Sequence, residues 1–155
     1  MRKIILGVAA SLDGLIEGPN GEYDWCFTDQ DYGMTGFLNR VDAIFYGRKS
    51  YEMMMGTGQP TTENPWAGKK SYVFSTTWQT NGKDFDLISG DVENEVRKIK
   101  RMKGKDIWLF GGASLTTSLL KAGLVDEFWL AVHPIVLGQG KPLFAGIEKR
   151  LRTKL

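Results

Sequence analysis

The chain has 155 residues, which is enough for one domain with a buried core of its own. Its composition, with 42% hydrophobic and 25% charged residues, is that of an ordinary globular protein. A formal net charge of +2 is too small to favour a nucleic-acid partner or binding to an acidic membrane surface.

Apolar runs along the chain predict strands that are buried on both faces of a sheet. They occupy residues 4–10, 43–46, 72–74, 107–110 and 128–132. Between them, apolar residues recur at helical spacing over 34–41, 92–102 and 115–120. Strands that alternate with helices indicate an α/β fold with a largely parallel central sheet.

The most basic stretch of the chain lies in the predicted helix 92–102, and we interpret it as a solvated helix face. Ser89 or Asp91 can cap the start of this helix, and lysines and arginines gather toward its end, where they match the helix dipole. This order explains the charge without a nucleic-acid site.

Two connections are long for a compact domain, residues 11–29 and residues 56–70. Loops of this length usually carry function. We therefore expect the first loop to close over a bound ligand.

Cys26 and His133 are the only cysteine and the only histidine. The usual disulfide and zinc arrangements therefore cannot form, and we expect no bound metal, an inert thiol at Cys26 and a structural role for His133. The first apolar run is interrupted by Ser11 and Asp13 before a signal peptide would be complete, and no run reaches transmembrane length. We expect a cytoplasmic protein with no membrane partner.

Groups suited to binding phosphate follow three of the predicted strands. They are Arg48 and Ser50 after the second strand, Ser75, Thr76 and Thr77 after the third, and Gly111 and Gly112 after the fourth. The glycines can bring backbone N–H groups close to an anion because no Cβ intervenes. Carboxyl ends of parallel strands meet at one edge of a sheet, so these segments predict a nucleotide lying across that edge. They do not form the GxGxxG fingerprint, which disfavours a standard dinucleotide-binding half.

Four segments also carry a family resemblance: SLDGLI at 11–16, GRKSYE at 47–52, GGASL at 111–115, and the late strand with its Gly-rich turn at 125–144. Their order resembles the dihydrofolate-reductase-like superfamily, especially the branch that contains the reductase domain of bacterial riboflavin biosynthesis. The resemblance implies a three-layer α/β/α fold with a mostly parallel central sheet and an antiparallel C-terminal strand. It implies one domain over residues 1–155, with the final C-terminal hairpin absent, shortened or completed by a partner chain.

The resemblance implies NADPH as the cofactor. Arg48 and the hydroxyls of Ser75, Thr76 and Thr77 would hold the adenosine 2′-phosphate. The residues expected along the pyrophosphate are Ser50, Gly112, Ala113, Ser114 and Leu115. Ala10 and Ile16 would flank the nicotinamide, and Gly47, Lys49, Phe110 and Gly111 complete the implied site.

Asp31 is the candidate catalytic proton donor, because its offset from Gly47 matches a buried carboxylate of the folate reductases. Its helical spacing to Met34 and Phe37 predicts that it faces inward, where desolvation would raise its pKa. Capping of the helix by Asp29 or Asp31 is an equally open alternative.

Asp13 and Trp25 are the other candidate substrate contacts. Asp13 either contacts the substrate or forms an Asx-type turn. Trp25, beside Asp24, would add an aromatic wall.

Together with these residues, the resemblance implies an NADPH-dependent reductase that transfers hydride to a pteridine or pyrimidine substrate in a dry pocket. The resemblance implies an activity like that of 5-amino-6-(5-phosphoribosylamino)uracil reductase of riboflavin biosynthesis or of dihydrofolate reductase, in a homodimer. The basic residues that would recognise a ribose 5-phosphate have no assigned counterpart, and Lys49 and Lys141 are the candidates. The alternative is a non-catalytic nucleotide-binding or regulatory domain that retains the cofactor cleft.

Overall fold

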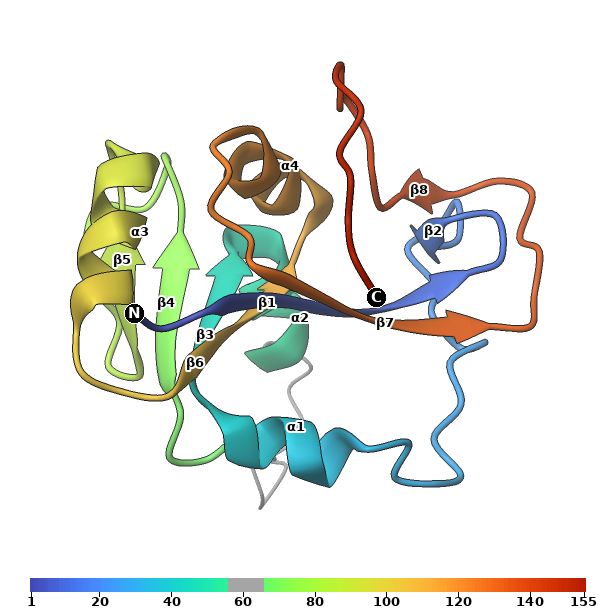
Figure 1. Cartoon of the computed structure of the whole chain (residues 1–155), viewed down its shortest axis with the longest axis horizontal. Helices are drawn as coiled ribbons and strands as arrows, with labels where there is room; N and C mark the ends of the chain where they lie inside the picture. The colour runs from blue at the N-terminus through green and yellow to red at the C-terminus, as the bar shows by residue number, and fades with distance from the viewer. Residues whose placement is uncertain (56–65) are drawn as a thin grey trace.

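A computed structural model describes residues 1–55 and 66–155 and shows a six-stranded central sheet (Figure 1). The strand order is β5-β4-β3-β6-β1-β7, and every neighbouring pair is parallel. The strands are β1 (Ile4–Ser11), β3 (Val41–Gly47), β4 (Lys70–Phe74), β5 (Phe85–Ile88), β6 (Asp106–Gly111) and β7 (Glu127–His133). All the predicted strands are present, so the α/β class and the mostly parallel sheet are confirmed.

The strand that the sequence pattern missed in this sheet is β5. It lies at the edge, where it pairs only with β4, and its first three residues are half-buried. Asp86 interrupts its apolar residues. An edge strand of four residues needs little apolar surface, and it therefore leaves no long apolar run in the sequence.

The helices of the described residues cover both faces of the sheet and confirm the three layers (Figure 1). α1 (Met34–Arg40) and α2 (Arg48–Met55) contribute Phe37 and Tyr51 to the core on one face. α3 (Val92–Arg101) and α4 (Ala113–Lys121) contribute Ile99 and Leu119 to the core on the other face.

Successive side chains of β1 feed these two cores. Ile4 and Leu6 belong to the core with α3 and α4, whereas Ile5 belongs to the core with α1 and α2. Each is at most 1% exposed. Complete burial of such a side chain contributes about 1.5–3 kcal/mol, so β1 is a rigid support for residues at its carboxyl end.

α3 begins and ends as its charge order predicts. The Asn94 N–H donates to the Asp91 carboxylate at 3.0 Å, which makes Asp91 the cap. Along the helix, Arg97 pairs with Glu93 and Lys98 with Glu95. Lys100, by contrast, pairs with Asp126 outside the helix, at 2.6 Å.

The antiparallel C-terminal strand is present, but it pairs outside the central sheet. β8 (Lys141–Pro142) lies antiparallel to β2 (Leu15–Glu17). β7 instead runs parallel to β1, because the connection through α4 brings the chain back in the same direction. From residue 143 to the last residue the chain adds no further helix or strand.

The structure describes all of the first long predicted loop but only part of the second. The loop at 11–29 contains β2, whereas residues 56–65 of the loop at 56–70 lie outside the described residues. None of the helices in the described residues is long and apolar enough to cross a membrane.

Candidate functional site

A cavity of about 1160 Å³, here called the central cavity, runs along the carboxyl halves of β6, β1 and β7 and reaches α2. Its walls come from 6–9 of β1, 110–112 at the end of β6, 129–133 of β7, residues 49, 50, 53 and 54 of α2, and several residues between 21 and 34. Segments from both ends of the chain therefore meet around one space. Lys49, Ser50, Gly111, Gly112 and Thr116 form what we call its cofactor end.

The predicted phosphate segments 47–50 and 111–112 touch at the cofactor end. A Cβ added to Gly47 would lie 3.3 Å from the Gly112 nitrogen, and one added to Gly112 would lie 3.2 Å from Ser50 Oγ. The Gly111–Gly112 peptide is cis, and Gly111 has a φ of 123°, a conformation that favours glycine. The structure thus brings Gly47, Ser50 and Gly112 together as the sequence predicts.

α4 begins directly after this turn. Gly112 is its N-cap, and no side chain accepts a hydrogen bond there. Ala113 and Leu115 are buried, Ser114 is exposed, and none of them is among the residues that line the central cavity. Their contribution to anion binding would come from backbone N–H groups and the helix dipole.

Thr116 is a candidate residue that the sequence analysis missed. It is fully buried, it lines the central cavity, and its hydroxyl Oγ1 has no hydrogen-bond partner among the described residues. An unpaired buried hydroxyl costs free energy unless a ligand or water satisfies it. The signal for it was its position four residues after Gly112, which places both on one side of α4.

Arg48 begins α2, as predicted, but its side chain is already engaged. Its Nη1 donates to both carboxylate oxygens of Glu52, at 2.9 and 2.8 Å. Strand register pairs Gly47 with Phe74, so Arg48 and Ser75 follow adjacent strand ends at the same edge of the sheet. A phosphate at this edge would have to share the guanidinium with Glu52.

The three hydroxyl side chains after β4, those of Ser75, Thr76 and Thr77, differ in the hydrogen bonds that they make. Ser75 Oγ accepts hydrogen bonds from the N–H groups of Thr77 and Trp78, both at 3.2 Å, and lies 3.2 Å from the Thr77 hydroxyl. Ser75 therefore organises a local turn. Thr76 is exposed and makes no side-chain hydrogen bond in the part of the chain that the structure describes.

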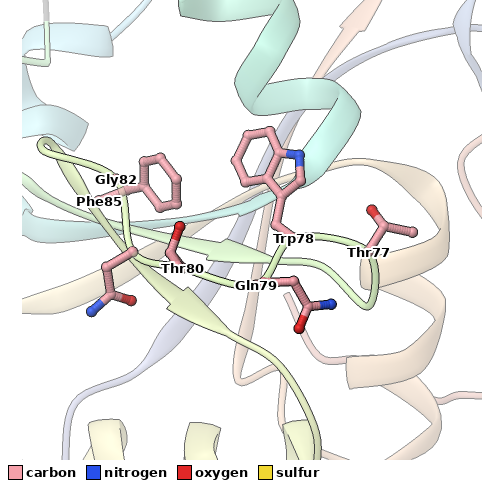
Figure 2. A pocket seen from close by; sticks show the side chains of 7 residues that line it. Thr77, Trp78, Gln79, Thr80, Gly82 and Phe85 are labelled. Carbon is pink, nitrogen blue, oxygen red and sulfur yellow. The ribbon is translucent and has the colours of Figure 1, made fainter.

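A shallow pocket of about 390 Å³ lies beyond this turn, in the connection from β4 to β5 (Figure 2). Trp78 points toward α2 in Figure 2, and its ring meets Tyr51 of α2 edge to face with centroids 6.3 Å apart. Phe85 also meets Tyr51, at 4.9 Å. These contacts make Trp78 a packing residue and join the hydroxyl-bearing turn to α2.

Three other residues of the implied cofactor site lie on the cavity wall and one does not. Ile16, Lys49 and Phe110 line the central cavity, whereas Ala10 is buried in the core and does not. Lys49 is exposed and has no ion-pair partner among residues 1–55 and 66–155.

The expectation of a buried Asp31 with a raised pKa is wrong. Asp31 is exposed, and its carboxylate accepts from the Thr35 hydroxyl at 2.7 Å, the Thr35 N–H at 2.9 Å and the Gly33 N–H at 3.1 Å. These hydrogen bonds, led by that of the Thr35 hydroxyl, lower its pKa. α1 begins only at Met34, so helical spacing does not extend back to Asp31 and could not predict its direction. Asp31 lines the central cavity, and although Gly33 is the N-cap of α1, the Asp31 carboxylate binds the first turn of this helix through the Thr35 N–H.

Asp13 holds two distant segments together rather than lining the cavity. Its carboxylate accepts from the Ser11 hydroxyl at 2.6 Å and from the N–H groups of Gly138 and Leu137 at 2.8 and 3.1 Å. The hydrogen bond from Ser11, followed by that from Gly138, lowers the pKa of Asp13 to about 2. The structure gives this carboxylate a tertiary contact that neither earlier alternative included, and it supports no substrate contact.

His133 is structural, as expected, and it organises the aromatic residues of the loop at 11–29. The Phe27 N–H donates to Nε2 at 3.0 Å, and Nδ1 lies 2.9 Å from the Ala131 carbonyl. Trp25 and Phe27 both meet the imidazole edge to face, at 5.4 and 5.1 Å. Trp25 is not among the residues that line the central cavity, whereas Phe27 is. Burial, followed by the charge of Asp24, raises the pKa of Cys26, which favours the uncharged thiol.

This sheet, its layers and the cavity at its carboxyl edge define a dihydrofolate-reductase-like fold. The chain belongs to the RibD C-terminal domain family, whose model matches residues 2–155. The uncharacterized protein YyaP of Bacillus subtilis is 48% identical over 163 residues, which cover 99% of this chain and 86% of that protein. YwjB of the same organism is 34% identical over 159 residues, covering 99% and 90%. A putative dihydrofolate reductase of Caenorhabditis elegans is 30% identical over 140 residues, covering 84% and 71%.

Solved structures agree with this family. A putative riboflavin biosynthesis protein from Shewanella sp. PV-4 has a TM-score of 0.82 at 27% identity, covering 98% of this chain and 88% of that one. The Thermotoga maritima deaminase and 5-amino-6-(5-phosphoribosylamino)uracil reductase gives 0.71 at 14% identity, covering 99% and 51%. Dihydrofolate reductase from Enterococcus faecalis, solved with NADP(H), gives 0.67 at 15% identity, covering 94% and 79%. The last two likenesses show the fold alone.

Proposed function

We propose that the protein is a reductase that uses NADPH to reduce a heterocyclic compound of the pteridine or pyrimidine class. The observation that carries the proposal is the close approach of Gly47, Ser50 and Gly112 beside the unpaired hydroxyl of Thr116. Among the described residues the Thr116 hydroxyl has no hydrogen-bond partner, and it lines a cavity at the carboxyl edge of a parallel sheet. That edge is where nucleotides bind in open α/β folds.

The residues at the cofactor end fit a dinucleotide. A Cβ on Gly112 would crowd the Ser50 hydroxyl, so the glycine keeps space for a pyrophosphate beside that hydroxyl. The start of α4 offers N–H groups, and Lys49 offers a positive charge. NADPH bound along these residues would supply the hydride.

The 2′-phosphate of the cofactor would lie beyond the ends of β3 and β4. Arg48 and Ser75 follow these adjacent strand ends, and Thr76 and Thr77 come next. A guanidinium can bind phosphate through two parallel hydrogen bonds. Selectivity for NADPH over NADH would therefore depend mainly on Arg48.

The residues that would border the reacting rings are Ile16, Phe110 and Trp108. All three line the central cavity, and Trp108 is held in place because its Nε1 donates to the Gly7 carbonyl at 2.8 Å. Apolar walls of this kind exclude water from a hydride transfer.

The proton that accompanies the hydride would come from water. Of the carboxylates that line the cavity, Glu17 forms an ion pair with Lys141 at 3.5 Å, and Asp31 has a lowered pKa. A carboxylate that stays charged at neutral pH cannot donate a proton efficiently.

The lowered pKa of Asp31 also favours the second candidate, a nucleotide-binding domain without turnover. Transfer of deuterium from NADPH labelled at the hydride position separates the two. With pteridine and pyrimidine acceptors, the proposal predicts a reduced product that carries the label. Binding of NADPH without labelled product from any acceptor would instead support the binding domain.

We further propose one domain over residues 1–155 that acts in the cytoplasm as a homodimer. Val136 and Phe144 are large apolar side chains that stay exposed in the single chain, and they could contribute to a subunit contact. Sedimentation velocity should show a dimer, and a monomer at every accessible concentration would contradict this part of the proposal.

A further inference from the structure

The end of the central cavity that faces β7, here called the β7 end, is walled mainly by apolar and aromatic side chains. They are Tyr23, Phe27, Tyr32, Trp129, Leu130 and Val132. Phe37 stacks on Trp129 with ring centroids 4.5 Å apart and planes 4° apart, which fixes the plane of the indole. A flat ring would find extended van der Waals contact here.

Positive charge is scarce along the whole cavity. Its only cationic side chains among the described residues are Lys49 and Lys141, and no arginine lines it. Lys141 already pairs with Glu17, whereas Lys49 lies at the cofactor end. The residues 56–65 cannot add a cation wherever they lie, because their sequence contains no lysine, arginine or histidine.

Asp31 and His133, which also line the β7 end, disfavour an anion there. Asp31 is a carboxylate with a lowered pKa, so it adds negative charge. His133 uses both ring nitrogens, one toward Phe27 and the other toward Ala131. A phosphate bound to this imidazole would break the contact that holds the Phe27 backbone.

We infer that the substrate is an uncharged, flat heteroaromatic compound without a phosphate group. This inference rests on the proposed NADPH-dependent reduction and names its substrate class. Moving a phosphate from water into the β7 end would cost desolvation free energy that no cation there repays. An uncharged ring incurs no such cost and gains the apolar contacts.

The reduction is balanced by one hydride and one proton. A C=N bond of the substrate accepts the hydride at carbon and a proton from water at nitrogen, so the double bond becomes a single bond with new C–H and N–H bonds. In a dihydropterin this bond lies in the ring, and in a ribosylaminouracil it joins the exocyclic nitrogen to C1′ of the opened sugar. NADPH loses the hydride and leaves as NADP⁺. The substrate is reduced by two electrons, and no other reductant is needed.

Substrates matched in their rings and different in charge test the inference. The first pair is 5-amino-6-(5-phosphoribosylamino)uracil and the same compound without its phosphate, and the second is dihydrofolate and the uncharged dihydrobiopterin. We expect kcat/KM for NADPH oxidation to be roughly tenfold or more higher for the uncharged member of each pair, the size of one missing charge-assisted contact. A preference for the charged member of either pair would overturn the inference.

A variant that adds a cation gives an independent test. Tyr23 lines the β7 end and is 51% exposed, so Tyr23→Lys can be accommodated, and Tyr23→Gln is its uncharged control. The lysine should raise kcat/KM for the phosphorylated compound about threefold or more, and the glutamine should not. If both substitutions changed kcat/KM for the phosphorylated compound equally, the scarcity of cations would not be the reason why the cavity disfavours phosphate.

Direct titration of the protein with NADPH distinguishes failure of this inference from failure of the proposed function. If NADPH binds and neither uncharged compound is reduced, the substrate class is wrong and the cofactor site stands. If NADPH does not bind, the proposed function itself fails.

Discussion

Arg48 and Glu52 lie one turn apart on α2, and the Arg48 guanidinium donates from Nη1 to both carboxylate oxygens of Glu52, at 2.9 and 2.8 Å. The two side chains are 33% and 45% exposed, so the pair itself adds only about 0.3–0.5 kcal/mol of stability. The pair matters for the proposed cofactor binding, since a 2′-phosphate at this edge would compete with Glu52 for the guanidinium.

Arg48→Ala should weaken NADPH binding roughly tenfold to a hundredfold and leave NADH binding nearly unchanged. The reason is the loss of one charge-assisted contact, worth about 1.5–3 kcal/mol, that NADH does not make. Quenching of tryptophan fluorescence on titration measures both affinities. An Arg48→Ala protein with full NADPH preference would contradict the assignment.

Glu52→Gln should tighten NADPH binding about threefold and leave NADH binding unchanged, because it removes a competing carboxylate from Arg48. The effect should shrink at high salt. Weaker NADPH binding in this variant would mean that Glu52 orients Arg48 for the phosphate instead of competing with it.

Thr116→Val should stabilise the free protein and weaken cofactor binding. The substitution keeps the shape of the side chain and removes a fully buried hydroxyl that has no hydrogen-bond partner in the described part of the chain. Tm should rise by roughly 2–12 °C, since an unsatisfied buried group costs about 1–3 kcal/mol. NADPH affinity should fall about threefold to tenfold for one lost neutral hydrogen bond.

Thr116→Ser is the matched control, because it keeps the hydroxyl and loses only a methyl group. We expect NADPH affinity close to that of the original protein and a lower Tm. A lower Tm in both variants with unchanged affinity would make Thr116 a packing residue.

Asp13 should make the stability of the fold depend on pH in acid. Its pKa is about 2 in the folded protein, against an ordinary value of 3.8, chiefly because the Ser11 hydroxyl and then the Gly138 N–H donate to it. A folded pKa below the unfolded one stabilises the protein above the unfolded pKa, and this stabilisation is lost as pH falls through the folded value. Calorimetry should therefore show a fall in Tm between about pH 4 and pH 2 that is smaller in Asp13→Asn. Parallel curves for the two proteins would exclude Asp13 as a contributor.

Asp31→Asn should leave kcat/KM within about threefold of the original value, because the carboxylate binds the first turn of α1 and is not the proton donor in this proposal. The asparagine oxygen can still accept from the Thr35 N–H, so the fold should be kept. A loss of kcat of a hundredfold or more with unchanged NADPH affinity would restore Asp31 as a catalytic acid.

The fold was largely predictable because its signals are local. Ile4 to Ala10 and the other buried strands form unbroken apolar runs, and Gly111–Gly112 follows one of them at the start of a helix. β5 was not predictable from such a run, since Asp86 interrupts it and the strand is at the edge.

The sequence allowed us to predict that Gly47 and Gly112 lie close together, but it did not allow us to predict the positions of the Asp13 and Asp31 carboxylates. Gly47 ends β3 and Gly112 follows β6, and these two strands are neighbours in the sheet. Their close approach therefore follows from the strand order of a parallel sheet. Asp13 binds Gly138, which lies 125 residues later, and no local pattern contains that contact. Asp31 lies before the first residue of α1, so helical periodicity does not determine the direction of its side chain.

Calorimetric titration of the unaltered protein with NADPH and with NADH tests the central claim most directly. The account predicts that NADPH binds and that NADH binds roughly tenfold more weakly or worse. Absence of binding by either dinucleotide would contradict a cofactor site at Gly47, Ser50 and Gly112, and with it the reductase.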